Sequence, residues 1–272
     1  MFGHFKTADI IAYWCALVDN QCRQELKLRP GGLPGVIKSE RDYVSALSKG
    51  IRDLVSQEYA CLAETIDQGT EMENGVDGLI LFQFGNEVKI GWYEAKWPRV
   101  LQHNYPWDSV DGISHFSEQI LKQHRLPDAL AVWEMFFNEA DEGYNTPPYE
   151  AHGSSCVWHD AAYGFVRSEG LIHNRWTTAK LKDLLAVDGL NFYSIIYSII
   201  SCKKGKKISV KKGAASVTIP NPRKSDATLE IPLPEVPNDT FENGDGRIKD
   251  FMYREKIAGY LFIDLNWKKG HG

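Results

Sequence analysis

Two carboxylates and an amine flank a pair of apolar segments that are separated by a turn signal. Asp77 precedes the first segment, and Glu94 and Lys96 end the second. Gly85-Asn86 between the segments is typical of a two-residue hairpin turn. If these two residues form the turn, Asp77 and Glu94 lie directly opposite each other, with Cβ atoms roughly 4.5–5.5 Å apart.

This arrangement predicts a bound cation. Side chains alternate faces along a strand, so Lys96 lies on the same face as Glu94. Like charges directly opposite each other destabilise a sheet, which favours a cation between the two carboxylates. Mg²⁺ prefers oxygen ligands and binds through one or two carboxylates while keeping several waters. Asp77, Glu94 and the carbonyl of Ala95 would supply such ligands.

The elements around the hairpin are predicted from apolar spacing. Residues 7–27 form a helix, followed by a Pro- and Gly-rich break. Ser39 is the N-cap candidate of a long second helix whose apolar stripe continues to Leu62. Glu40 lies on that stripe and could reach the end of the hairpin. Residues 114–125 form a short helix that contains Gln119, and residues 129–137 form a strand.

The pattern is weaker after residue 140. The expectations there are a strand over Cys156–Val166, a helix over Thr178–Ala186 and a closing strand over Gly259–Leu265. Residues 191–202 fit either a helix or a strand. Residues 203–240 are expected to be a loop-rich insertion or β-arches.

The order helix, hairpin, helix, strand, with Asp77 seventeen residues before Glu94-Ala95-Lys96, resembles the PD-(D/E)XK nuclease superfamily over roughly residues 39–137. Members often carry an acid near the start of the helix before the hairpin, where Glu40 stands. Many also carry a glutamine in the following helix, where Gln119 stands. One departure is that the family core usually has a strand before the aspartate strand, and residues 64–76 show none. The proline of the motif name is also absent.

The resemblance implies an α/β protein with a restriction-endonuclease-like core, in which helices flank a mixed central sheet. Residues 1–140 would form this core with the N-terminal helices, and residues 141–272 a C-terminal extension of unknown role packed on it. The implied activity is hydrolysis of phosphodiester bonds in DNA with Mg²⁺ or Mn²⁺, in restriction, repair or phage defence. The implied catalytic residues are Asp77, Glu94, Lys96 and Gln119, and the implied metal ligands are Glu40, Asp77, Glu94 and Ala95.

In this scheme Lys96 stabilises developing charge, or its amine, partly desolvated, has a lowered pKa and accepts a proton. Gln119 positions water or phosphate. One alternative is a catalytically inactive subunit of the same fold that binds nucleic acid or a protein partner. Another is a surface hairpin whose acids form ordinary salt bridges with Lys96.

Three further groups have two interpretations each. A lysine run would contact phosphates, or is a solvated loop; it comprises Lys203, Lys204, Lys206, Lys207, Lys211 and Lys212. His152, Cys156 and His159 would hold zinc, or are ordinary residues of a strand. Tyr105 and Trp107 would stack on unpaired bases, or belong to the core.

Composition is that of an ordinary globular protein, with 272 residues of which 43% are hydrophobic and 25% charged. The net charge of −5 does not indicate a nucleic-acid binder, although a local basic groove remains compatible with it. The five cysteines include no CxxC pair, which favours a reducing cytoplasm. The apolar run 10–18 is too short to span a bilayer, so no membrane partner is expected. A homodimer, or a subunit of a larger complex, is expected.

Overall fold

The computed structural model describes residues 2, 4–26, 35–66, 75–98, 107–137, 152–222, 224, 226–234 and 246–266. Its helices are α1 (Phe5–Gln24), α2 (Glu40–Val55), α3 (His115–Gln123), α4 (His159–Ser168), α5 (Thr178–Asp188), α6 (Phe192–Ile200) and α7 (Gly246–Glu255). The main sheet contains β1 (Ala60–Thr65), β2 (Gly78–Phe84), β3 (Glu87–Lys96), β6 (Ala131–Phe136), β7 (Ser155–Trp158), β8 (Leu190–Asn191), β9 (Ile208–Ser209) and β12 (Gly259–Asp264). Two small hairpins are β4 (Val110–Asp111) with β5 (Ile113–Ser114), and β10 (Ser216–Pro220) with β11 (Thr228–Pro232).

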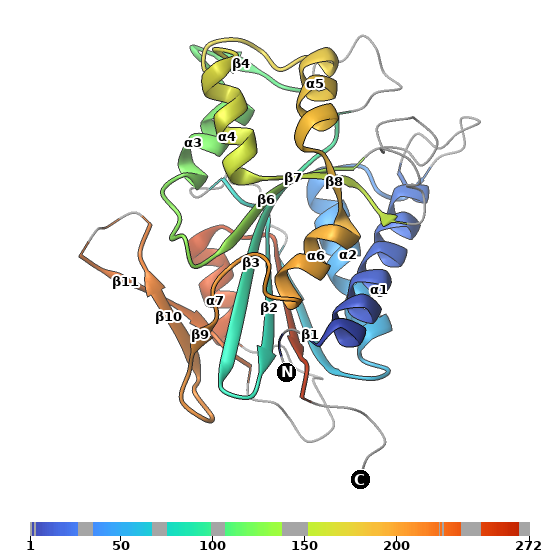
Figure 1. Ribbon diagram of the computed structural model, residues 1–272, viewed down its shortest axis with the longest axis vertical. Helices are drawn as coiled ribbons and strands as arrows, with labels where there is room; N and C mark the ends of the chain where they lie inside the picture. Colours follow the sequence, from blue (N-terminus) through green and yellow to red (C-terminus); the bar gives the residue numbers. More distant parts are fainter. Residues whose placement is uncertain are drawn as a thin grey trace.

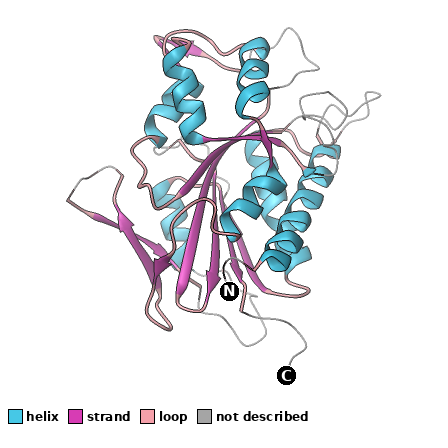
Figure 2. Ribbon diagram, in the orientation of Figure 1, coloured by secondary structure: helices cyan, strands magenta, loops and turns pink. Residues whose placement is uncertain are grey.

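The central sheet is mixed, and helices flank it on both faces (Figures 1 and 2). Its strand order is β1-β12-β2-β3-β6-β7-β8, and β9 pairs with the outer part of β3. The mixed α/β class predicted from the sequence is therefore confirmed. None of the described helices is both long and apolar enough to cross a lipid bilayer.

The predicted hairpin turn is present. Gly85 has φ +58°, a left-handed conformation that favours glycine, and Phe84 pairs with Glu87 across the turn. The antiparallel pairing then continues in the predicted register as far as Gly78 opposite Tyr93. Both faces of the hairpin are buried, as its two apolar faces predicted.

β12 lies inside the sheet, between β1 and β2, antiparallel to the first and parallel to the second. The backbone amides of Ala258 and Gly259 both donate to the carbonyl of Asp77, at 2.9 and 3.1 Å. The predicted strand over 259–265 is therefore present, and it borders the hairpin directly. Because β7, β8, β9 and β12 all come from residues 141–272, the central sheet is shared between the two halves of the chain.

Several predicted boundaries differ from the structure. α2 begins at the predicted N-cap, where Ser39 accepts a hydrogen bond from Asp42, but it ends at Val55, and Leu62 belongs to β1. Leu62 matches the apolar spacing of α2 by coincidence, because a buried strand residue can fall at the same interval along the sequence. The strand predicted over Cys156–Val166 stops at Trp158, after which α4 begins. The ambiguous segment 191–202 is mostly α6.

The core has three parts. α1, α2 and α6 cover one face of the sheet, and α7 with β10–β11 covers the other. The third part joins α3, α4 and α5, which Figure 1 shows together at the top of the molecule. Trp107 packs in this third part, with its ring 5.5 Å from Phe116 and 6.3 Å from Trp176, so its role is packing. Tyr105 lies outside the described residues.

Asp108 fixes the start of α3. It is buried, and its Oδ1 accepts the amide of Phe116 at 3.1 Å. Its Oδ2 accepts the Ser114 hydroxyl and the amide of Trp176, both at 2.9 Å. The Ser114 hydroxyl in turn caps α3 by accepting from the amide of Ser117. One carboxylate therefore ties α3 to a distant loop.

Replacing this carboxylate should destabilise the protein strongly. Asp108→Ala leaves three buried donors without a partner, and we expect it to lower the free energy of unfolding by about 3 kcal/mol or more. Urea denaturation measures this change. Asp111→Ala, at an exposed position three residues later, is the control and should be nearly neutral. A loss in Asp108→Ala as small as that of the control would contradict the anchoring role.

Candidate functional site

Asp77 bonds along β3 where the regular hairpin pairing ends. Its amide donates to the carbonyl of Tyr93 at 2.7 Å, and its Oδ2 accepts the amide of Ala95 at 2.7 Å. The pairing of Asp77 directly opposite Glu94, predicted by extending the register, does not continue past Gly78. The reason is local, because the side chain of Asp77 takes the place of a backbone acceptor for Ala95. Successive residues of a strand direct their backbone groups to opposite edges, so the carbonyl of Ala95 points toward the Asp77 edge.

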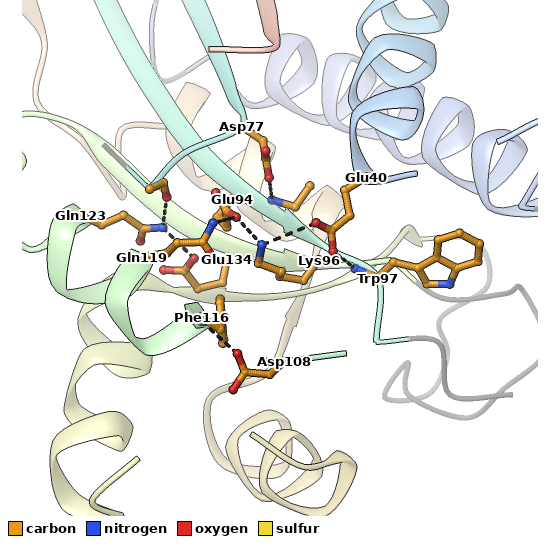
Figure 3. A network of polar contacts seen from close by, with 12 residues as sticks. Glu40, Asp77, Glu94, Lys96, Trp97, Asp108, Phe116, Gln119, Gln123 and Glu134 are labelled. Atoms are coloured by element: carbon orange, nitrogen blue, oxygen red, sulfur yellow. Dashed lines mark hydrogen bonds and ion pairs between the residues drawn. The ribbon is translucent and has the colours of Figure 1, made fainter. Parts of the chain in front are cut away.

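Lys96 connects two of the predicted acids (Figure 3). Its Nζ lies 2.6 Å from Glu94 Oε1 and 3.5 Å from Glu40 Oε2. The other oxygen of Glu40 accepts the amide of Trp97 at 2.9 Å, which holds the start of α2 against the end of β3. Glu40 therefore reaches the strand end as its place on the helix predicted.

Gln119 approaches from α3. Its Nε2 donates to Glu94 Oε1 at 2.5 Å, so the amide holds the carboxylate in one orientation. The sequence analysis assigned Gln119 the positioning of water or phosphate. In the structure its side chain contacts Glu94 instead. The structure thus brings together the side chains of Glu40, Asp77, Glu94, Lys96 and Gln119.

Burial shapes the charges of this cluster. Asp77, Glu94 and Lys96 are each at most 7% exposed. Burial raises the pKa of Asp77 to about 6. Burial and the neighbouring charge of Asp77 raise the pKa of Glu94 well above its usual value. Charged carboxylates are therefore costly here unless a cation accompanies them.

The pKa of Lys96 is also raised, but by the neighbouring charges and not by burial. Burial alone lowers the pKa of its ammonium, but the carboxylates of Glu40, Glu94 and Asp77 outweigh burial and raise the pKa above the usual value. Lys96 therefore stays protonated in this arrangement. The lowered pKa considered from the sequence is therefore wrong for this arrangement, and the role of Lys96 in charge stabilisation stays a prediction.

The oxygen atoms of the cluster fit a hard divalent cation. Glu94 Oε2 is buried and receives no hydrogen bond from a donor within the described part of the chain, and the carboxyl of Asp77 lies within hydrogen-bonding reach of Glu94. With the carboxylate of Asp77 and the carbonyl of Ala95 it forms an all-oxygen set. The described residues contain no group of three or more His, Cys, Asp and Glu side chains arranged to hold a metal. Mg²⁺ does not need such a group, because one or two carboxylates and waters suffice.

His152, Cys156 and His159, considered as zinc ligands from the sequence, do not form a metal-binding group within the described residues. Cys156 is buried, and its thiol faces the carbonyl of Ser154. His159 instead forms hydrogen bonds with a pair that the sequence analysis missed, Gln123 and Glu134.

The polar group formed by Gln123, Glu134 and His159 lies beside the cluster that contains Glu94. The parallel pairing of β3 and β6 places Glu134 next to Glu94 in register. Gln123 Nε2 donates to Glu134 Oε2 at 3.0 Å and to the carbonyl of Gly75 at 2.5 Å. Two signals were available in the sequence: Gln119 and Gln123 are four residues apart on one helix face, and Glu134 is the only charged residue of its predicted strand.

The lysine run is divided between two places: Lys204 lies next to Asp160 at the start of α4, and Lys207 lies at the end of β3 far from the carboxylates. β9 pairs with β3 at Glu87 and Val88, eight residues from Lys96, or about 26 Å along an extended strand. Lys207 forms an ion pair with Glu87 at 3.1 Å, at that far end. The run is in the loop between α6 and β9 and just after β9, and consists of Lys203, Lys204, Lys206, Lys207, Lys211 and Lys212.

Comparisons with known proteins give no match: no protein-family model, curated protein or solved structure resembles the chain significantly. The geometry of the cluster is therefore the basis for a functional assignment.

The stability of the metal-free protein should depend on pH through Glu94. Its pKa in the folded state lies above the usual 4.5, so the folded state binds more protons than the unfolded state above that pH, and stability falls as pH rises. Glu94→Gln cannot ionise, so in EDTA it should become more stable relative to wild type at pH 8 than at pH 5. Urea denaturation at both pH values measures this.

Glu118→Gln is the matched control, because its side chain is 45% exposed on the same helix as Gln119. It should show no comparable change between the two pH values. An unchanged difference between wild type and Glu94→Gln across pH would contradict the assigned direction.

Proposed function

We propose that the protein is a metal-dependent nuclease of the PD-(D/E)XK type that hydrolyses phosphodiester bonds in DNA. It would act as an effector in restriction, repair or phage defence. One observation carries the proposal: Asp77, Glu94 and Lys96 meet in a buried cluster at the end of two adjacent strands, and one carboxylate oxygen of Glu94 receives no hydrogen bond from a donor among the described residues. Buried polar atoms normally have partners, so this oxygen is suited to a ligand.

The order of elements supports a restriction-endonuclease-like core. α2 precedes the β2–β3 hairpin, α3 follows it, and β6 returns parallel to β3. The strand that the family usually has before the aspartate strand corresponds in sequence to β1. β1 does not pair with β2 directly, because β12 lies between them.

Charge balance also supports a divalent ion. When ionised, Glu40, Asp77 and Glu94 carry three negative charges around the single ammonium of Lys96, a formal excess of two. Asp77, Glu94 and the carbonyl of Ala95 would hold Mg²⁺ or Mn²⁺, with Glu40 bound directly or through water. The ion, when bound, lowers the pKa of a coordinated water and polarises the phosphoryl oxygen.

The remaining roles belong to the chain itself. The Lys96 ammonium lies next to Glu94 and would stabilise negative charge that develops on the phosphate oxygens. Gln119 keeps the carboxylate of Glu94 in one orientation. The amide of Ala95 does the same for Asp77. Such fixed positions reduce the reorganisation needed when the phosphate is attacked.

One contact favours an inactive subunit that binds nucleic acid or a protein partner with the same fold. The ion pair between Lys96 and Glu94, at 2.6 Å, already provides a positive partner for the buried acid. A protein that never binds metal would need such internal compensation. Activity and metal binding separate the two proposals.

Cleavage should depend on both charged partners. Asp77→Asn removes a metal ligand, and Lys96→Met removes the ammonium, so we expect each to lower the cleavage rate by about 10²–10³-fold or more. The assay is nicking of plasmid DNA and degradation of single-stranded DNA with Mg²⁺ or Mn²⁺. Glu118→Gln is the control and should cleave like wild type. Wild-type rates in Asp77→Asn and Lys96→Met would refute the catalytic assignment.

Metal binding should be measurable without cleavage. A ligand that binds only the folded state stabilises it, by about 2.7 kcal/mol at a hundred times its Kd. We expect Mg²⁺ to raise the melting temperature of the wild type relative to EDTA at pH 8, and to have no such effect on Asp77→Asn. Differential scanning fluorimetry gives both values. The same shift in wild type and Asp77→Asn would place the ion elsewhere.

A further inference from the structure

A pocket of about 210 Å³ lies beside the Gln123–Glu134 pair. Part of its wall is apolar and comes from the segment between α3 and β6 and from β6 itself, with Leu126, Leu130 and Val132. Trp158 adds an aromatic ring, and His159 lines the pocket next to it. The loop after α6 forms another side, where the amide of Lys206 bonds to the carbonyl of Ala129.

His159 contributes a nitrogen that lacks a partner. The residue is only 6% exposed, and its Nε2 is buried without a hydrogen-bond partner among the described residues. An unsatisfied buried polar atom carries a cost that a ligand can remove.

The hydrogen-bond network fixes what this nitrogen can do. His159 Nδ1 lies 2.9 Å from Gln123 Oε1 and 3.3 Å from Glu134 Oε1, and both are acceptors because the Gln123 amide nitrogen donates to Glu134 and Gly75. Nδ1 must therefore carry the hydrogen. In a neutral ring Nε2 is then an acceptor, which selects a ligand with an N–H donor.

The rim of the pocket also favours a ligand that carries hydrogen-bond donors. Asp128 and Asp160 supply further acceptors, and Lys204 is the only basic side chain among the lining residues other than the histidines. Lys204 is also close to Asp160, at 3.7 Å, and lies over the Trp158 ring. Two carboxylates against one ammonium disfavour a bare phosphate and favour a neutral group that bears donors.

The volume of the pocket limits the size of the ligand it can hold. Pockets for drug-sized molecules measure roughly 300–1,000 Å³, so this one suits a single ring system. A planar heterocycle with an amino group would stack near Trp158, contact the apolar walls and donate to His159. Adenine, cytosine and guanine have these properties, whereas the N3–H of thymine is flanked by two carbonyl acceptors that the carboxylates of Asp128 and Asp160 disfavour.

The pocket lies close to the carboxylate cluster. Val132 pairs with Trp92 in β3, two residues before the in-register pair Glu134 and Glu94. Two residues of a strand span about 7 Å, so a base in the pocket belongs to a nucleotide very near the one whose phosphate reaches Glu94.

We propose that this pocket binds one unpaired, amino-bearing nucleobase of the DNA strand being cut. His159 Nε2 accepts from the base, and the Glu134–Gln123 pair fixes the ring of His159. The inference deepens the proposed function and rests on it, because the base belongs to the nuclease substrate. It predicts a preference for DNA with a bulged, flipped or single-stranded purine or cytosine, since extruding a paired base has an energetic cost.

The first experiment tests the pocket without metal or cleavage. Deoxyadenosine, deoxycytidine, thymidine and inorganic phosphate are titrated in EDTA into the full chain, and amide and Trp158 indole shifts are followed by NMR. We expect deoxyadenosine and deoxycytidine to shift the Trp158 indole and to bind more tightly than thymidine. Saturable binding of phosphate with no effect of deoxyadenosine would overturn the inference.

Variants of the pocket residues test whether His159 Nε2 is the hydrogen-bond acceptor for the base. His159→Asn keeps a donor where Nδ1 lies but removes Nε2, and should weaken deoxyadenosine binding about five- to tenfold, as expected for one lost hydrogen bond. His173→Asn, at an exposed histidine, is the matched control. The double variant Asp128→Asn and Asp160→Asn alters only exposed rim residues and should also weaken binding. Binding equal to wild type in both pocket variants would refute the assignment.

The second experiment uses the substrate. Duplexes with one bulged adenine, one bulged thymine or no bulge are cut with Mg²⁺, and the rate ratio of bulged adenine to paired duplex is compared between proteins. We expect a ratio of about ten in wild type and close to one in His159→Asn, with the cut within one or two nucleotides of the bulge. A ratio near one in wild type would overturn the preference.

The two proposals fail separately. Specific deoxyadenosine binding with no cleavage of any DNA would refute the nuclease and show that the pocket takes a free nucleoside or a base of bound DNA. Cleavage that depends on Asp77 without nucleoside binding would refute the pocket and leave the nuclease intact.

Discussion

β3 and β6 run parallel, and this pairing decides where α3 must lie. Two parallel neighbours need a crossover connection, so the chain between them has to pass over one face of the sheet. α3 is in that connection, and its inner side presents Gln119 to Glu94 and Gln123 to Glu134. The register of the same pairing puts the two glutamates next to each other. Moving β6 by one residue would direct Glu134 to the opposite face and separate the two groups.

Burial of the charged side chains in this cluster opposes folding. Acids that are almost fully buried have raised pKa values, and a single lysine provides the compensating charge inside the cluster. Buried pairs of this kind contribute little net stability when compared with apolar residues of the same size. Asp108 anchors the start of α3 one helical turn before Gln119, and this supplies some of the rigidity that such a site requires.

The parts of this architecture that depend on neighbours in sequence could be predicted. Gly85-Asn86 specified the hairpin turn and most of its register, and Ser39 specified the start of α2. Those two elements, with α3, were enough to group Glu40, Glu94, Lys96 and Gln119. Pairings between distant segments could not be predicted, because a strand's periodicity does not reveal its partner. The position of β12, and the contact of Glu134 with His159, are of this kind.

Prediction from neighbouring residues was wrong at two kinds of position. In one, a side chain replaced a backbone hydrogen-bond partner; in the other, the spacing of helix and strand residues coincided. At Asp77 the carboxylate bonds to the amide of Ala95, so the ladder stops one residue earlier than extrapolation suggested. At Leu62 a helical spacing continued by chance into β1. The lysine run was identified by composition alone, which carries no information about its distance from the acids.

The carbonyl of Asp77 accepts hydrogen bonds from Ala258 and Gly259, residues that enter the sheet with β12. During synthesis the segment with the acids is therefore complete long before the strand that holds its backbone has been made. A chain emerging from the ribosome has its carboxylates but lacks the neighbour that fixes the first of them. Because such long-range pairing forms late, the cluster takes its final geometry only after β12 has been made and is free to pair. If the proposed nuclease activity depends on this geometry, chains that still lack β12 would be inactive.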